Sequence, residues 1–127
     1  MSLQSIVLHE QKEKKKVATE ALLWLKRALE FTARGLRLNL SDPQQELSAS
    51  FQKAYESTLS PFHNFMIRPV FSLAMKACPK RLDFYTTLGN GTEIKILMVQ
   101  FEEWLCAMEK LVAILVVFYA QGGYDKL

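Results

Sequence analysis

Residues 18–38 carry the clearest hydrophobic pattern of the chain; they read ATEALLWLKRALEFTARGLRL. At the 100° per residue of an α-helix, the apolar side chains gather in one arc that is wider than a surface helix needs. The centre of that arc holds Leu22, Leu25, Leu29, Thr32, Ala33 and Leu36. The polar arc holds Lys26, Arg27, Glu30, Arg34 and Arg37. The pattern predicts a centrally placed helix with ion pairs from Glu30 to Lys26 or Arg34, four residues away on either side.

The start of the chain is patterned more weakly. Leu3, Ile6 and Val7 form a short helical stripe, and residues 10–16 then read EQKEKKK. Two Glu residues interrupt the lysines, which favours a solvated helix face or a disordered link over a basic membrane-facing patch. No Pro or Gly separates this run from residues 18–38, so the sequence allows one continuous helix.

The middle of the chain carries two successive helix-start signals. Asp42 followed by Pro43 is typical of an N-cap and a first helical residue, and apolar residues at helical spacing continue to residue 59. Ser-Pro at 60–61 repeats the signal, and a broad apolar face continues to residue 77. Pro69 lies inside this second segment, so a kink or loose turn is expected near Phe65.

The last third of the chain predicts a short helix at 81–88 and a long one that starts at Thr92. Gly89-Asn90-Gly91 separates the two, and Gly122-Gly123 ends the second. The chain has no alternating strand pattern and no internal repeat. The predicted fold class is all-α, a layered or bundled set of long helices.

Trp24 is the most informative residue, because it lies at the border of the apolar arc with Glu20 and Arg27 beside it. A flat ring at a polar boundary can stack on a sugar or cover the mouth of a pocket. Large aromatic side chains are more often part of a core, so periodicity alone favours a core Trp with one edge of its ring exposed to solvent. The pattern leaves both interpretations open.

Length and composition restrict the class of protein. The 127 residues suit one domain, and half of them are apolar, which is enough for a core. A net charge of +3 argues against a dedicated nucleic-acid binder. The first ten residues lack a signal-peptide pattern, and Cys78 and Cys106 form no CxxC pair and no metal-site spacing, so a cytosolic protein with reduced thiols is expected. The longest apolar run, 111–120, is half of a bilayer span, which predicts only peripheral membrane contact.

Candidate catalytic groups are few. His9 and His63 are the only histidines, and the chain has no zinc-protease motif, phosphate loop or nucleophile elbow. Glu102, Glu103 and Glu109 are weak evidence for a paired-carboxylate site. We therefore expect no enzyme, no cofactor and no metal site. Eight Phe and five Met could instead line a hydrophobic pocket between helix layers, or be plain core.

Two blocks of sequence resemble motifs of the glycolipid transfer protein family. The first is ATEALLWLKRALEF, and the second, in the family's order and spacing, is AYESTLSPFHNFMIRPVFSLAMKACPKRLDFY. The segments LQSIVLHE and AMEKLVAIL are similar to the glycolipid-transfer domain at the C-terminus of some phosphoinositide-binding adaptor proteins. The resemblance covers residues 3–119. It implies a two-layer all-α carrier of sphingolipids in the cytosol, which contacts membranes transiently at its surface.

The resemblance also implies roles for individual residues. Trp24 falls at the family Trp that stacks on the first sugar, and His63 at the His that hydrogen-bonds the ceramide amide. The implied pocket-lining positions are Tyr55, Leu59, Phe71, Met75 and Phe84. Phe65 falls at an aromatic residue that touches the membrane. Because an aromatic beside a cation suits a membrane interface, Phe62 and Arg68 join this predicted surface.

One part of the family pattern has no counterpart in the sequence. Family members recognise the headgroup with an Asp, an Asn and a Lys on a preceding helix, and no residues here match that motif. We therefore expect residues 1–127 to form one glycolipid-transfer-like domain that lacks its first helices. The uncovered apolar face predicts low solubility or self-association. A truncated helical remnant that serves as a protein-interaction scaffold remains an alternative to lipid transfer.

The expected headgroup is a neutral sugar. A branch of the family that carries ceramide 1-phosphate has basic residues at the positions of Glu20 and Trp24. These positions are one helical turn apart, so both side chains face the same site. Glu20 would repel a phosphate, whereas an indole ring and a carboxylate suit the face and the hydroxyls of a sugar. Arg27 completes the predicted headgroup-binding set, and a ceramide 1-phosphate carrier remains the second alternative.

Overall fold

The structure is a computed structural model that describes residues 2–126. Within this range the chain forms helices and 3₁₀ turns and no strand, which confirms the predicted all-α class. The α-helices are α1 (Leu3–Glu13), α2 (Val17–Ser41), α3 (Leu47–Thr58), α4 (Arg68–Lys76), α5 (Arg81–Gly89) and α6 (Ile94–Gly122). The 3₁₀ turns are η1 (Ser60–Phe62) and η2 (Tyr124–Lys126).

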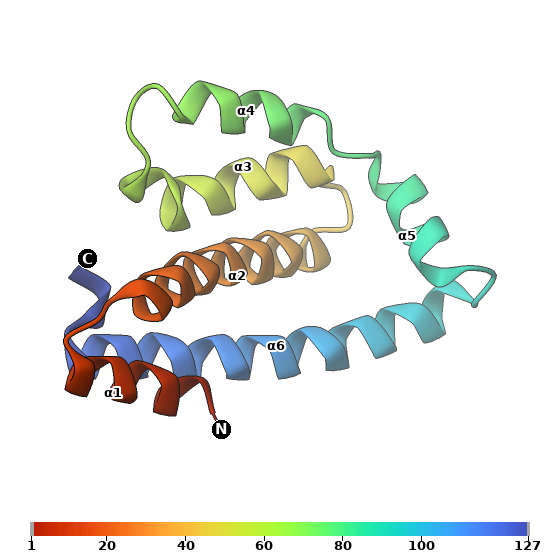
Figure 1. The fold of residues 1–127 in the computed structure, drawn as a ribbon. Coiled ribbons are helices and arrows are strands. Elements are labelled where there is room, and N and C mark those ends of the chain that lie inside the picture. The colour runs from red at the N-terminus through yellow and green to blue at the C-terminus, as the bar shows by residue number, and fades with distance from the viewer. Residues whose placement is uncertain (1, 127) are drawn as a thin grey trace.

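Helix α2 is the central element of the arrangement (Figure 1). On one side it packs along α3, with α4 beyond, and on the other side it packs along α6. Helix α1 packs against α2 and shares a buried cluster with α2 and α6. Helix α5 lies at one end of the molecule and connects α4 to α6. The central position predicted for the helix that carries Trp24 is therefore confirmed.

Three clusters of buried apolar side chains hold the helices together. The first cluster, between α2, α5 and α6, contains Ala33, Leu36, Tyr85, Leu97, Phe101 and Leu105. The second, between α1, α2 and α6, contains Val7, Leu22, Leu23, Leu115 and Tyr119. The third contains Tyr55, Leu59 and Met75, with Phe31, Phe51 and Phe71 packed against it. This third cluster joins α2, α3 and α4.

A break separates α1 from α2, so the continuous helix that the sequence allowed does not form. Lys14 ends α1 in a left-handed conformation, with φ at 58°. The Glu10 carboxylate accepts hydrogen bonds from the backbone N–H groups of Ala18 and Thr19, at 2.8 and 2.6 Å. It therefore serves α2 as an N-cap side chain does, and these hydrogen bonds, that of Ala18 above all, lower the pKa of Glu10.

The helix start predicted at residues 42–43 is wrong. Helix α2 runs through residue 41, and α3 begins only at Leu47. The carboxylate at position 42 instead accepts a hydrogen bond from the N–H of Gln44 at 3.0 Å, a local turn that competes with helix formation. Arg81 of α5 also holds this loop in place, because its guanidinium donates a hydrogen bond to the carbonyl oxygen of Asn39 at 2.6 Å.

The helix predicted over residues 60–77 is divided, and the turn expected near Phe65 is confirmed. Helix α4 begins only at Arg68, and Pro69 lies in its first turn, where proline is tolerated. The side chain of Asn64 accepts hydrogen bonds from the backbone N–H groups of residues 66 and 67, each at 3.0 Å. Asn64 rather than Pro69 therefore shapes the turn.

The short helix at 81–88 and the long last helix are confirmed with small shifts of their ends. Asn90 and Gly123, both in the left-handed conformation, follow α5 and α6, and Glu93 rather than Thr92 precedes α6. Residues with positive φ thus end both helices, as the Gly and Asn residues at these two places in the sequence predict.

Two basic residues of the predicted polar arc of α2 are buried, which the helical pattern did not predict. Lys26 forms the expected ion pair with Glu30, at 3.7 Å, and its ammonium also lies 6.0 Å from the ring of Tyr119. Arg27 lies against Phe62 of η1. Both burials arise because other parts of the chain cover this side of α2, and long basic side chains can lay their stems along such apolar neighbours.

Helix α6 is apolar on both sides. One stripe packs into the core, and the other presents Ile96, Val99, Trp104, Leu111, Ile114 and Val117 to solvent. Within residues 2–126, α6 is the one helix long and apolar enough to cross a membrane, a property that the uninterrupted run at 111–120 did not predict. A helix that is apolar all round is also typical of one buried between two layers of helices.

Candidate functional site

Trp24 and His63, far apart in the sequence, lie next to each other in the structure. Trp24 comes from α2 and is 41% exposed, and His63 follows η1. Their ring centroids are 6.0 Å apart and their planes are inclined by only 24°. The fold therefore brings together the two residues that carry the resemblance, at the boundary between solvent and the third apolar cluster.

Tyr55 orients His63. Its hydroxyl lies 2.8 Å from Nδ1 of His63, and its ring stacks on Phe71 at 5.4 Å with planes 6° apart. Burial, and secondly the charge of Arg68, lowers the pKa of His63, while burial raises the pKa of Tyr55. Both groups are therefore neutral at pH 7. When the phenol donates to Nδ1, the neutral imidazole carries its proton on Nε2, which is a donor for a carbonyl oxygen.

Arg27 lies beside Trp24 but is only 3% exposed. Its guanidinium carbon is 4.8 Å from the ring centroid of Trp24 and 3.8 Å from that of Phe62. Its Nη2 donates to the carbonyl oxygen of Asp125 at 3.3 Å, and burial lowers its pKa. Arg27 therefore offers little surface to a ligand, unlike the direct headgroup contact predicted for it.

Glu20 lies one turn before Trp24 and is exposed. No ion pair joins it to Lys16 in the part of the chain that the structure describes; the two residues share only the backbone hydrogen bond of the first turn of α2, at 2.8 Å. Its carboxylate is therefore available beside the Trp24 ring.

An apolar cavity of about 280 Å³ lies between α2, α3 and α4. It is lined by Phe31, Phe51, Phe71, Ala74, Met75 and Cys78. Phe71 and Met75 were predicted to line a pocket, and the predicted Tyr55 and Leu59 are buried in the adjoining third cluster. The cavity contacts the Tyr55–His63 pair through the ring of Phe71, which lies 4.7 Å from that of His63.

Phe84 does not join this cavity. It lies in α5, packs against the first cluster and lines a separate depression with Pro79, Asp83, Thr87 and Leu88. Phe31 and Phe51 line the cavity although neither was predicted to do so. Phe31 carried a usable signal, because it follows Trp24 by two helical turns and so lies on the same face of α2.

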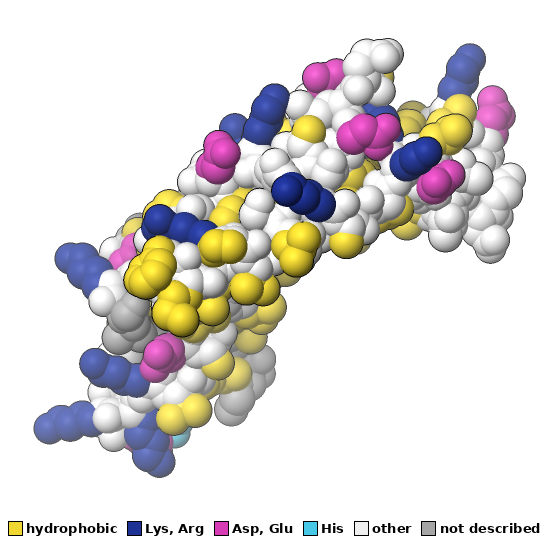
Figure 2. All heavy atoms as spheres, turned by 90° about the horizontal axis from the view of Figure 1, so that it is seen from above, with side chains coloured by type: hydrophobic (Ala, Val, Ile, Leu, Met, Phe, Trp, Pro, Cys, Tyr) yellow, Lys and Arg dark blue, Asp and Glu magenta, His cyan; other side chains and the backbone are white. Residues whose placement is uncertain are grey.

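The segment from η1 into α4 presents a group of apolar side chains to solvent. Phe65 is 79% exposed and Phe62 is 49% exposed. Their exposed apolar neighbours are Met66, Ile67, Val70 and Leu73. Arg68 is exposed and donates from Nε to the carbonyl oxygen of Ser60 at 3.1 Å. Figure 2 looks onto the α4 side of the molecule and shows hydrophobic and basic side chains side by side on this surface.

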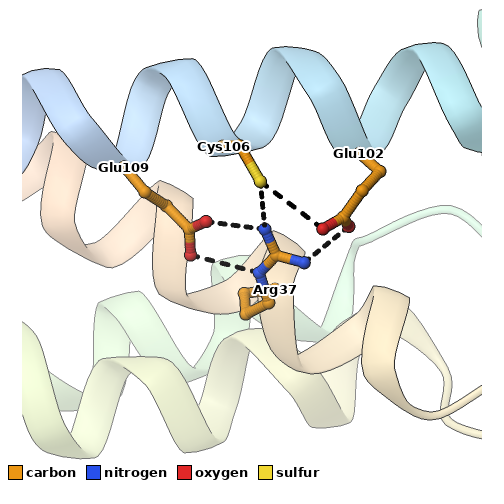
Figure 3. A network of polar contacts seen from close by, with 4 residues as sticks. All are labelled: Arg37, Glu102, Cys106 and Glu109. Carbon is orange, nitrogen blue, oxygen red and sulfur yellow. Dashed lines mark hydrogen bonds and ion pairs between the residues drawn. The ribbon is translucent and has the colours of Figure 1, made fainter.

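A charged network lies on the other side of α2. Arg37 donates to the carboxylates of Glu102 and Glu109 of α6 and contacts Cys106, as Figure 3 shows. The hydrogen bonds to the two carboxylates raise the pKa of Arg37 above its ordinary value. Glu102 and Glu109 therefore pair with an arginine that connects two helices, and no group of three metal-ligating side chains occurs among the described residues.

Comparison with known sequences finds similar proteins. The sequence model for glycolipid transfer protein (GLTP) matches residues 1–90. The glycolipid transfer protein of Aureobasidium melanogenum is 47% identical over 119 residues, which are 94% of this chain and 58% of that protein. The chain thus spans little more than half the length of this relative.

Comparison with solved structures shows the same fold. The fungal glycolipid transfer protein HET-C2 superposes with a TM-score of 0.88 at 41% identity, over 98% of this chain and 61% of that one. Human ceramide-1-phosphate transfer protein in complex with 12:0 ceramide-1-phosphate gives a TM-score of 0.89 at 21% identity, over 99% of this chain and 65% of that one, a likeness of fold alone. The predicted glycolipid-transfer-protein-like helical fold is confirmed.

Proposed function

The chain belongs to the glycolipid transfer protein family, and on this premise we propose that it binds a sphingolipid and carries it between membranes without an enzymatic step. One observation carries the proposal. A half-exposed Trp24, a neutral His63 and an apolar cavity adjoin one another. Together they suit a molecule with a polar head, an amide and hydrocarbon chains.

His63 suits the amide of a ceramide. Because the Tyr55 hydroxyl occupies Nδ1 at 2.8 Å, the remaining Nε2–H can donate to the amide carbonyl oxygen. Phe71 packs against both rings and holds the imidazole in place. A neutral donor is suited to a neutral carbonyl group beside an apolar cavity, where a charged imidazolium would be costly to desolvate.

The cavity between α2, α3 and α4 suits the hydrocarbon chains. Its lining is almost entirely apolar, with three Phe rings and Met75. Each methylene group that moves from water into such a lining gains about 0.8 kcal/mol. Flexible Met75 can adapt to chains of different shape.

Glu20 and Trp24 favour a sugar headgroup over a phosphate. Glu20 is exposed on the helix face of Trp24, so a phosphate would meet a carboxylate. Arg27, which packs on the Trp24 ring, is 3% exposed, so its guanidinium is not free to donate the paired hydrogen bonds that a phosphate prefers. A sugar can instead stack one face on the Trp24 ring and donate a hydroxyl to Glu20.

The exposed group around Phe62, Phe65 and Arg68 suits the contact with a membrane. Aromatic rings and snorkelling cations are favoured at the level of lipid headgroups. The group lies on the segment that also carries His63, so membrane contact would bring the site to the lipid source. This arrangement supports a cytosolic carrier that docks transiently.

The test is transfer of fluorescent galactosylceramide and of fluorescent ceramide 1-phosphate between phosphatidylcholine vesicles, with the longest form of the protein that its gene encodes. We expect faster transfer of the sugar lipid and at least tenfold slower sugar-lipid transfer in Trp24→Ala, a loss of about 1.4 kcal/mol or more. Trp104→Ala is the matched control, because Trp104 lies on α6 and stacks on Phe101 of the first cluster, not on residues of the site. Preferential transfer of the phosphate lipid, or equal effects of the two substitutions, would contradict the proposed site.

A further inference from the structure

Arg27 contacts three parts of the candidate site that are distant in the sequence. Its guanidinium carbon lies 3.8 Å from the Phe62 ring centroid in η1 and 4.8 Å from the Trp24 ring centroid in α2. Its Nη2 donates to the carbonyl oxygen of Asp125 in η2 at 3.3 Å. One buried side chain thus connects the predicted membrane contact, the aromatic platform of Trp24 and the 3₁₀ turn η2.

The guanidinium depends on these neighbours for its stability. Arg27 is 3% exposed, its Nε has no hydrogen-bond partner, and no ion pair with a carboxylate forms within residues 2–126. A buried cation without an ion pair is costly, and burial accordingly lowers the pKa of Arg27. The charges of Glu30 and Asp125 act on the pKa of Arg27 in the opposite direction, and the cation–π contacts with the two rings add to the compensation.

Phe62 belongs to two environments at once. Its ring covers the guanidinium of Arg27, and yet it is 49% exposed beside Phe65, which is 79% exposed. A ring that moves into the headgroup region of a bilayer leaves the guanidinium it covered. The Trp24 ring, which packs on the same guanidinium, then loses part of its support.

We propose that Arg27 is a positioning residue that couples Phe62 to Trp24, so that insertion of Phe62 into a membrane loosens the Trp24 platform. In solution the Phe62–Arg27–Trp24 stack holds the platform in place, and at a membrane surface the platform becomes mobile enough to accept or release a headgroup. This role rests on the proposed function, because it assigns a step of lipid exchange to the same site. It replaces the direct headgroup contact first predicted for Arg27.

The coupling is measured without any lipid cargo, in a Trp104→Phe chain whose only tryptophan is Trp24. Time-resolved fluorescence anisotropy reports the mobility of its ring. We expect Phe62→Leu to increase the amplitude of the fast, local motion about twofold, because the ring that covers Arg27 is lost. Phe65→Leu is the matched control, three residues further along the chain, and should leave the anisotropy unchanged. Equal anisotropy in the two variants overturns the coupling.

A double-mutant cycle with Arg27→Met separates the coupling from general loosening of the fold. If Arg27 transmits the effect, Phe62→Leu adds little mobility once Arg27 is replaced, whereas independent effects would add. Arg27→Lys, which keeps the charge but loses the planar fork, should give an intermediate amplitude. Additive effects in the cycle overturn the proposal. Circular dichroism identifies any variant that does not fold, and Arg27→Lys then takes the place of Arg27→Met.

Phosphatidylcholine vesicles test the membrane step. Binding to vesicles should raise the Trp24 mobility of the Trp104→Phe chain about twofold and leave that of the Arg27→Met chain unchanged, because its platform is already loose. An unchanged Trp24 mobility on bound vesicles overturns the step. Transfer of galactosylceramide is followed separately, so that absent transfer with intact coupling contradicts the proposed function alone, and intact transfer without coupling contradicts this inference alone.

Discussion

Trp24 and Arg27 are three residues apart on α2, and the fold gives them opposite exposures. The helical spacing of the sequence places Trp24 at the border of the apolar arc and Arg27 in the polar arc. The structure leaves Trp24 at 41% exposure and buries Arg27 to 3%. Helical periodicity reports which face of its own helix a residue lies on. It carries no information about the turns η1 and η2, which cover Arg27.

His63 leads to a prediction on pH and stability at the residue scale. Burial holds the pKa of folded His63 below its ordinary value of 6.5. As the pH falls below 6.5, the unfolded chain takes up a proton before the folded chain does. The free energy of unfolding should therefore decrease until the pH reaches the pKa of His63 in the folded protein. Urea unfolding of wild type and His63→Gln between pH 7 and pH 5 measures this.

The decrease should be clearly smaller in His63→Gln. His9→Gln is the matched control, because the His9 side chain is 70% exposed and pairs with Glu13 at the surface of its own helix. The same pH dependence in wild type and His63→Gln would show that His63 is solvated in solution.

At the scale of whole elements, Arg37 connects helix α2 to helix α6. It reaches from α2 to two carboxylates of α6 that lie two helical turns apart, Glu102 and Glu109 (Figure 3). The sequence placed all three residues correctly on helices, and it gave no reason to pair them. Their distance in the chain, 65 residues for Arg37 and Glu102, shows why a local pattern could not find the network.

Replacement of Arg37 should weaken this junction without unfolding the protein. We expect Arg37→Met to lower the free energy of unfolding by about 1 kcal/mol, because the three groups are partly solvated and such pairs are individually weak. Arg34→Met is the control, because Arg34 is exposed on the same helix. The difference between the two variants in urea unfolding should shrink at high salt, where partly exposed charges are screened. A difference that does not depend on salt would assign the loss to packing of the arginine stem.

The second apolar face of α6 is a property of the whole molecule. One stripe of α6 fills the core, and the opposite stripe presents Leu111, Ile114 and Val117 to solvent. The chain spans 58% of the length of its relative from Aureobasidium melanogenum, so that relative has further residues without a counterpart in these 127. An apolar face of this kind is unfavourable in water and is a site of association.

These 127 residues alone are therefore expected to self-associate. Sedimentation velocity over a range of concentrations should show a rising weight-average mass, and Leu111→Lys combined with Ile114→Lys should reverse the rise. Val70→Lys with Leu73→Lys, on the exposed face of α4, is the matched control and should leave association unchanged. A compact monomer at every concentration would show that α6 is covered in solution.

The sequence by itself determined the helices and several of their ends. The 3.6-residue spacing of apolar side chains, and turn residues such as Asn90 and Gly123, act over a few neighbouring positions, so the helical class and the ends of α5 and α6 follow from local chemistry. Only the tertiary structure decided the burial of Arg27 and the meeting of Trp24 with His63. Each of these depends on contacts between segments that are distant along the chain, and their energies are absent from any local pattern.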